Sequence, residues 1–161
     1  MLRLSRYLLL LLCLFAGMAR SQLTIEIIGG GATTIPIAIV PFANENSYSL
    51  SMTGIVAADL ARSGLFKMVD PGGVVPRPSR AEDVRFGDWT GRGADAVVVG
   101  SMAPQADGRV EVRFALLDAV KQTQLGGFAY VVQPAQIRAT AHKIADVIYE
   151  KLTGDVGVFR T

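Results

Sequence analysis

The sequence predicts one α+β domain, in which about five strands form a mixed sheet and two main helices pack against it. Short runs of apolar residues, typical of strands, recur between turn signals, and two longer stretches repeat apolar residues at helical spacing. The last three predicted strands follow one another with only short turns between them, which is a meander order. Half of the 161 residues are hydrophobic, so the chain can build a core. No internal repeat is visible, and the sequence predicts no β-propeller.

The first 21 residues have the three parts of a secretory signal peptide. Arg3 and Arg6 give a positive start, residues 7–15 are an unbroken apolar run, and small residues follow in 16–21. The apolar run is too short for a membrane anchor, which needs about 20 apolar residues. We therefore predict that residues 1–21 are a cleavable signal peptide and that the protein is exported.

Two cleavage positions fit this pattern, one after Ala19 and one after Ser21. Cleavage between Ser21 and Gln22 is preferred because it leaves an alternating apolar pattern at the new terminus. Cys13 lies inside the apolar run behind Leu12, without the small residue that a lipidated cysteine requires before it.

The charge of the chain changes when the predicted signal is removed. The whole chain has 16 Lys and Arg against 14 Asp and Glu, and residues 1–21 hold three arginines and no acid. The remainder has 13 basic and 14 acidic residues, a net charge of −1, which gives no basic excess of the kind that nucleic-acid binding needs. It also lacks cysteine, so the core and not disulfides must stabilise it.

The predicted elements of the exported part follow in order. Leu23, Ile25 and Ile27 alternate with polar residues as in a half-apolar strand, and three glycines at 29–31 follow as a flexible break. The other predicted strands are a buried strand closed by Pro41, a short strand after the first helix, a central valine-rich strand, and two strands that each follow a turn; their ranges are 35–42, 65–69, 96–102, 110–117 and 125–132.

Two main helices are predicted. The first covers 50–63, with Met52, Val56 and Leu60 on one stripe, and Gly64 ends it. The second begins at Pro134 and ends at Gly154, with an apolar face formed by Ile137, Ala141, Ile144 and Ile148. Between them, 70–80 contains three prolines and two glycines and is expected to be an irregular surface excursion, and a short helix is possible around 82–90.

The sequence contains little that indicates catalysis, and we predict no catalytic residue, no metal site and no cofactor. His142 is the only histidine, which excludes a histidine cluster, and it lies one step off the apolar stripe as a partly exposed structural residue. A hydrolase that uses Ser51 or Asp59 with His142 is the alternative from a different class, but no nucleophile-elbow motif supports it. Residues 29–31 lack the following helix and lysine that a phosphate loop needs.

Three further residues have structural interpretations. Trp89 is expected to pack beneath a loop, Asp95 to bond backbone amides in the turn before the valine strand, and Glu82 with Asp83 to lie in an exposed turn.

Four segments, in order, resemble the N-terminal domain of the TolB family of the Tol–Pal system. They are Pro36 to Phe42, Ile55 to Leu60 with Ser63-Gly64 and Phe66, Gly93 to Gly100, and Glu150 to Gly154 with Gly157 to Thr161. The first three are shared with other envelope domains of similar fold, and the fourth is more specific. The resemblance implies a TolB-like α/β domain over 35–154 and, over 155–161, the start of a linker to a β-propeller that this sequence does not contain.

The family resemblance also implies a binding segment. In TolB proteins the mature N-terminus is a mobile arm that binds the C-terminal domain of TolA, and here it corresponds to 22–34, an arm with a glycine-rich hinge. The expected contact residues are Gln22, Leu23, Thr24, Ile25, Glu26, Ile27 and Ile28. An alternating segment is suited to adding a strand to the edge of a partner's sheet. The alternative is that 22–28 is a fixed edge strand of this domain.

The function implied by the resemblance is that of a periplasmic, non-enzymatic protein-binding component. It would couple inner-membrane TolA to outer-membrane Pal, for outer-membrane integrity and constriction during cell division, with Pal bound through the propeller. The resemblance also implies a role in the cell cycle and in protein import. The alternative is another periplasmic binding module of the same fold, such as an activator of peptidoglycan synthases. Phe159 is expected to have no partner within this domain.

Overall fold

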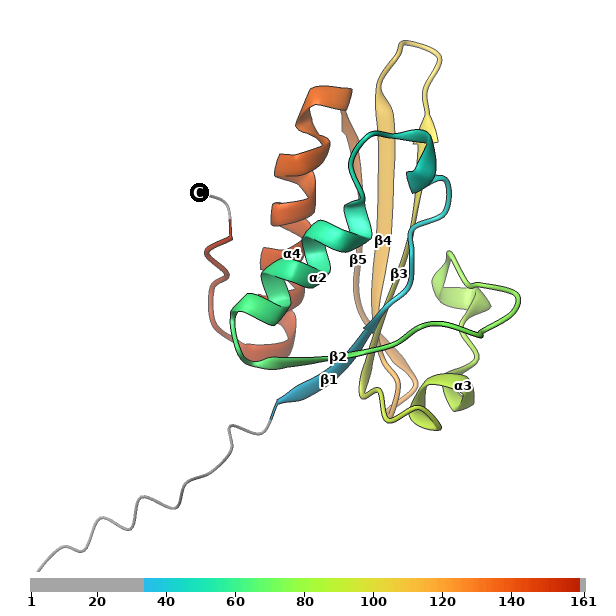
Figure 1. Ribbon diagram of the computed structural model, residues 1–161, viewed down its shortest axis with the longest axis vertical. Coiled ribbons are helices and arrows are strands. Elements are labelled where there is room, and N and C mark those ends of the chain that lie inside the picture. Colours follow the sequence, from blue (N-terminus) through green and yellow to red (C-terminus); the bar gives the residue numbers. More distant parts are fainter. Residues whose placement is uncertain (1–33, 160–161) are drawn as a thin grey trace, which may run out of the picture. The chain divides into compact units, whose positions relative to one another are not determined.

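The computed structural model describes residues 34–159, which form one sheet with helices on both of its faces (Figure 1). Its five strands are β1 (Ile35–Ile39), β2 (Phe66–Val69), β3 (Ala96–Pro104), β4 (Val110–Asp118) and β5 (Thr123–Val132). The helices are α2 (Met52–Arg62), α3 (Phe86–Thr90) and α4 (Ile137–Thr153), with 3-10 turns η1 (Glu45–Ser47), η2 (Ala81–Asp83) and η3 (Pro134–Gln136). The predicted fold class, a five-stranded mixed sheet with two main helices, is confirmed.

The sheet has the strand order β2-β1-β3-β4-β5. β1 pairs in parallel with both β2 and β3, while β3, β4 and β5 are antiparallel neighbours, as the predicted meander requires. β3 is the central strand, and its valines are fully buried because both faces of the sheet are covered there. The first strand ends at Ile39, earlier than predicted. After it the chain stays beside β3 through the Val40 N–H bond to the Val98 carbonyl and an isolated parallel bridge between Ala43 and Ser101.

α2 and α4 lie side by side on one face of the sheet (Figure 1). The predicted stripes of both helices are in the main core, where every member is at most 3% exposed: Met52, Val56, Leu60, Ile137, Ala141, Ile144 and Ile148. Gly64 and Gly154 follow the two helices with φ of 75° and 82°, so the predicted stops are confirmed. Pro134 begins η3, which leads directly into α4.

The other face of the sheet carries a second, smaller core under the 70–95 segment. The excursion at 70–80 has no helix or strand, as predicted, and the expected short helix is divided into η2 and α3. Trp89 is 1% exposed and packs with Val74 and Val84, so its prediction as a residue beneath a loop is confirmed.

Two expectations about individual residues are wrong. The Asp95 side chain makes no hydrogen bond within residues 34–159; instead the backbone N–H of Asp95 donates to the Pro36 carbonyl and its own carbonyl accepts from Ala119. Main-chain hydrogen bonds with Pro36 and Ala119 therefore hold this turn in place. Phe159 does have partners: its ring packs edge-on against Tyr149, and its N–H donates to the Asp146 carboxylate at 2.7 Å.

Candidate functional site

The predicted binding residues 22–28, and the predicted cleavage position between Ser21 and Gln22, lie outside the described residues. What the structure gives is the point at which that segment joins the domain. Ile35, the first residue of β1, donates its N–H to the Leu65 carbonyl at 2.8 Å and packs at the edge of the main core. The end of the predicted hinge is therefore attached to a strand that is paired on both sides.

A small open pocket lies beside this junction. Its volume is about 240 Å³, and its lining residues come from the starts of β1 and β3, the β4–β5 turn and the end of α4: Ile35, Asp95, Ala96, Asp118, Val120, Lys121 and Leu152. Val120 is 64% exposed although it is large and apolar. The pocket is open, and none of the described side chains that line it is placed as a catalytic or metal-binding group would be.

The residues of the hydrolase alternative meet in one place. Ser51 precedes α2, Asp59 lies within it and His142 lies on α4, and all three line an open pocket of about 310 Å³. His142 Nδ1 is 2.5 Å from Asp59 Oδ2, across 83 residues of sequence. The Asp59 carboxylate is 2% exposed and also accepts a hydrogen bond from Arg62 at 3.1 Å.

This arrangement does not form a nucleophile activated by a base. The Ser51 hydroxyl caps α2, where it accepts the Gly54 N–H at 3.0 Å, and no hydrogen bond joins it to His142 within the described chain. Acyl transfer needs the nucleophile within hydrogen-bond reach of its base. His142, with 24% of its side chain exposed, instead ties α4 to α2 through Asp59. The prediction of a partly exposed structural histidine is confirmed.

The Asp59–His142 contact was not predicted from the sequence. Sequence spacing shows only that both residues lie next to the apolar stripes of their helices. Which residue of one helix meets which residue of the other depends on how the two helices cross, and no local pattern records that.

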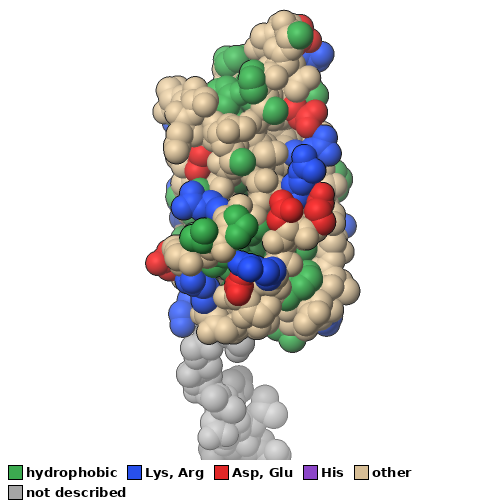
Figure 2. Space-filling view, turned by 90° about the vertical axis from the view of Figure 1, so that its right-hand side faces the viewer, with side chains coloured by type: hydrophobic (Ala, Val, Ile, Leu, Met, Phe, Trp, Pro, Cys, Tyr) green, Lys and Arg blue, Asp and Glu red, His purple; other side chains and the backbone are tan. Residues whose placement is uncertain are grey.

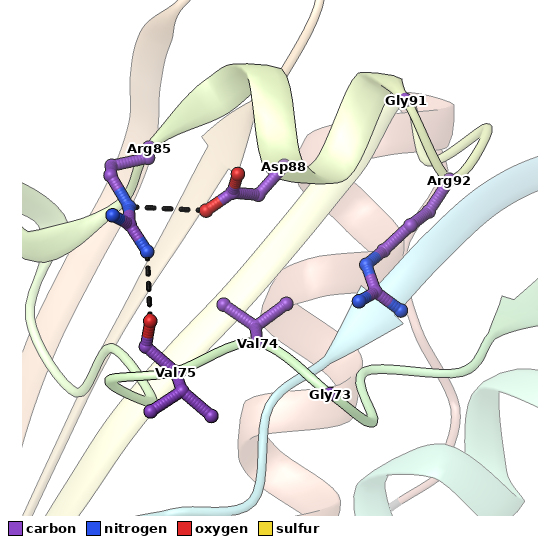
Figure 3. Close-up of a pocket in the computed structure, with 7 residues that line it drawn as sticks. All are labelled: Gly73, Val74, Val75, Arg85, Asp88, Gly91 and Arg92. Atoms are coloured by element: carbon purple, nitrogen blue, oxygen red, sulfur yellow. Dashed lines mark hydrogen bonds and ion pairs between the residues drawn. The ribbon is translucent and has the colours of Figure 1, made fainter.

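A third pocket lies between α3 and the excursion (Figure 3). It has a volume of about 380 Å³ and is lined by Gly73, Val74, Val75, Arg85, Asp88, Gly91 and Arg92. The Arg85 guanidinium bonds the Asp88 carboxylate at 3.1 Å and the Val75 carbonyl at 3.0 Å, which holds the loop against the helix. Arg92 points toward Gly73 and makes no hydrogen bond or ion pair within residues 34–159 (Figure 3). Arg85 is already bonded to Asp88 and Val75. We therefore interpret this pocket as the place where the loop is held against α3, and not as a binding site.

A hollow of about 600 Å³ lies over β3, β4 and β5, next to the 70–95 segment. Its lining combines small side chains, such as Ala103, Ala115 and Ala129, with charged residues of both signs, among them Glu111 and Arg113. Figure 2 shows acidic, basic and hydrophobic side chains mixed over this side of the molecule. Glu111 and Arg113 already pair with each other at 2.7 Å.

Metal and membrane sites have no support in the described part of the chain. Residues 34–159 contain no group of three or more histidine, cysteine or carboxylate side chains that could hold a metal ion. The same residues contain no helix long and apolar enough to cross a membrane.

Comparison with known proteins decides the family. The family model for the TolB amino-terminal domain matches residues 23–125. The chain belongs to the TolB family. It is 51% identical over 154 residues to the Tol-Pal system protein TolB of Nitrosospira multiformis and 53% identical over 152 residues to that of Nitrosomonas europaea. These matches cover 95% and 94% of this chain but only 35% of each relative, so the chain spans about a third of their length.

A solved structure agrees with this assignment. The crystal structure of TolB from Acinetobacter baumannii is similar with a TM-score of 0.66 and 35% identity, over 79% of this chain and 30% of that one. The resemblance to the TolB N-terminal domain is thus confirmed.

Proposed function

We propose that this TolB-family domain is a periplasmic, non-enzymatic protein-binding component of the Tol–Pal system that binds the C-terminal domain of TolA through residues 22–28. The observation that carries the proposal is the alternating segment Gln22 to Ile28, placed directly before the hinge and β1 in a chain of this family. In the whole protein the domain would couple inner-membrane TolA to outer-membrane Pal, for outer-membrane integrity and constriction during division.

Strand addition to TolA is the mechanism that fits the arm. The segment can offer backbone N–H and C=O groups along one edge, while its apolar side chains alternate with polar ones. We infer that Leu23, Ile25 and Ile27 enter the partner and that the ladder of main-chain hydrogen bonds supplies the rest of the affinity. The three glycines at 29–31 would then act as the hinge between this arm and strand β1.

The pattern of alternation gives a specific test. Ile25→Asp should weaken binding of the TolA C-terminal domain by at least roughly tenfold, because it removes a buried apolar side chain and buries a charge. Thr24→Asp is the matched control, since in the proposed strand Thr24 would face the opposite side from Ile25, and it should change the affinity much less. Equal losses in the two variants, measured by calorimetric titration, would contradict alternate-side insertion.

The position of signal cleavage belongs to the same proposal. Cleavage after Ser21 places Gln22 at the free end of the arm, whereas cleavage after Ala19 would add Arg20 and Ser21 to it. N-terminal sequencing of the exported protein should give Gln22 as the first residue. A start at Arg20 would contradict the proposed arm boundary.

Catalysis has no part in this proposal. His142→Gln should support normal envelope integrity, measured as resistance to detergent, because the histidine ties two helices together and touches no activated nucleophile. Loss of integrity in a variant that folds normally would favour a catalytic or binding role for His142. The alternative of a peptidoglycan-synthase activator is less favoured, because relatives 45–53% identical to this chain are Tol-Pal system proteins.

A further inference from the structure

The open pocket between α2 and α4 has properties of a binding surface that the arm does not explain. Its floor is apolar, with Leu50 and Ile55 partly exposed and Ala58 exposed. Its rim carries Arg62 from α2 and Arg138 from α4, both on the exposed surface. Arg138 lies one helical turn before His142, so both side chains are on the same side of α4.

The charge of this groove is unbalanced. Asp59 is its only acidic lining residue, and that carboxylate is 2% exposed and already occupied by His142 and Arg62. Arg138 makes no hydrogen bond or ion pair with any residue of 34–159. The groove therefore presents positive charge to solvent, without an exposed carboxylate to neutralise it.

Donors for an acidic ligand remain available in the groove. A guanidinium carries five N–H donors, and Arg62, with 72% of its side chain exposed, uses one nitrogen on Asp59. The buried Asp59 carboxylate holds the Arg62 guanidinium in place, so its remaining N–H donors are partly preorganised.

We propose that this α2–α4 groove binds an acidic peptide segment of a partner protein, with carboxylates on Arg138 and Arg62 and an apolar side chain over Leu50 and Ile55. A peptide fits better than a free anion because the floor is apolar and can bury a side chain between the charged contacts. A peptide also fits better than a membrane surface, because the cationic side chains surround an open pocket of about 310 Å³ and do not line a flat face.

The test uses the purified chain and a fluorescent twelve-residue peptide of glutamate and leucine, followed by anisotropy at low ionic strength. Binding should be saturable and should weaken with added salt. Arg138→Glu should weaken it at least roughly fivefold, because one attractive charge becomes a repulsive one. Lys143→Glu is the matched control: it is the next cation on α4, but its ammonium lies over the Tyr130 ring, 4.4 Å from the ring centre, and should change binding less than roughly twofold.

Several results would overturn the proposal. They are absence of saturable peptide binding, equal loss in the two charge-reversal variants, and binding of phosphatidylglycerol vesicles in place of the peptide. Thermal unfolding of Arg138→Glu should match that of the original chain, since Arg138 has no described partner whose loss could unfold the domain. Deletion of 22–28 should leave peptide binding unchanged, so failure of this proposal is distinguishable from failure of the proposed TolA contact.

Discussion

At the scale of single residues, Asp59 is the polar side chain on which the helix layer depends most. Its carboxylate is almost fully buried and accepts hydrogen bonds from both His142 and Arg62. A buried carboxylate is tolerated only when it is paired, because the lost hydration must be replaced. The pair therefore fixes how α2 and α4 lie against each other, in addition to the apolar contacts beneath.

Asp59→Ala should lower the free energy of unfolding by about 2–4 kcal/mol, because it leaves His142 without its acceptor and opens a space between the helices. Arg62→Ala is the control, and it should cost less than about 1 kcal/mol because the arginine is mostly exposed. Urea unfolding followed by circular dichroism measures both. Similar losses in the two variants would show that Arg62, and not His142, is the partner that matters.

A second prediction at this scale concerns Asp107, which lies in the turn between β3 and β4. The backbone N–H of Arg109 and then its guanidinium, at 3.1 and 2.7 Å, lower the pKa of the Asp107 carboxyl below its ordinary value. A depressed pKa means that the contact adds stability at pH above the ordinary value and that this is lost as pH falls through the folded value.

A titration of the Asp107 carboxyl by NMR should therefore have a midpoint below that of an unfolded aspartate. Arg109→Ala should raise the pKa of Asp107 only part of the way back, because the backbone donor remains. Arg92→Ala, which removes a cation outside this turn, should leave the midpoint unchanged. If the pKa of Asp107 returned fully to its ordinary value in Arg109→Ala, the guanidinium alone would cause the lowered pKa, and the contribution of the backbone donor would be contradicted.

At the scale of elements, the segment after α4 is packed and not free. Gly157 is buried, and a Cβ atom there would lie 2.6 Å from both Asp146 Cα and Oδ1. Phe159 contacts Tyr149 with ring centres 5.6 Å apart, and Tyr149 contacts Phe66 of β2 at 6.0 Å. The chain therefore turns back along α4 after Gly154.

Gly157→Val should displace this segment, because the larger side chain has no space beside Asp146. We expect a loss of about 1–3 kcal/mol in unfolding free energy and faster hydrogen exchange of the Phe159 amide. Val158→Ala, at a side chain that is 76% exposed, should change stability by less than about 0.5 kcal/mol. Unchanged exchange at Phe159 in Gly157→Val would contradict the packing.

Elements with strong local patterns were predictable from the sequence, and contacts between distant elements were not. The stripe of Met52, Val56 and Leu60 and the valines of β3 are local signals, because burial on one face imposes the period. The Asp146–Phe159 and Asp59–His142 contacts depend on how helices, sheet and terminal segment pack together. The candidate binding segment 22–28 was indicated by its alternation and by family resemblance alone.

At the scale of the whole molecule, the described domain is a packed sheet and helix layer to which the proposed arm attaches. β1 is paired on both sides, so Ile35 gives the arm a fixed point of departure. The proposed TolA contact and the α2–α4 groove involve different residues. Because the chain spans about a third of its relatives' length, contacts with Pal remain proposals for the whole protein.

Titration of the TolA C-terminal domain with the exported chain, with and without residues 22–28, tests the central claim most directly. The intact chain should bind with a measurable affinity, and the deleted chain should show a loss of at least roughly a hundredfold, because both the ladder and the apolar contacts are gone. Both proteins should unfold at the same temperature, since every helix and strand that the structure describes lies after residue 34. Unchanged affinity in the deleted chain would contradict the account.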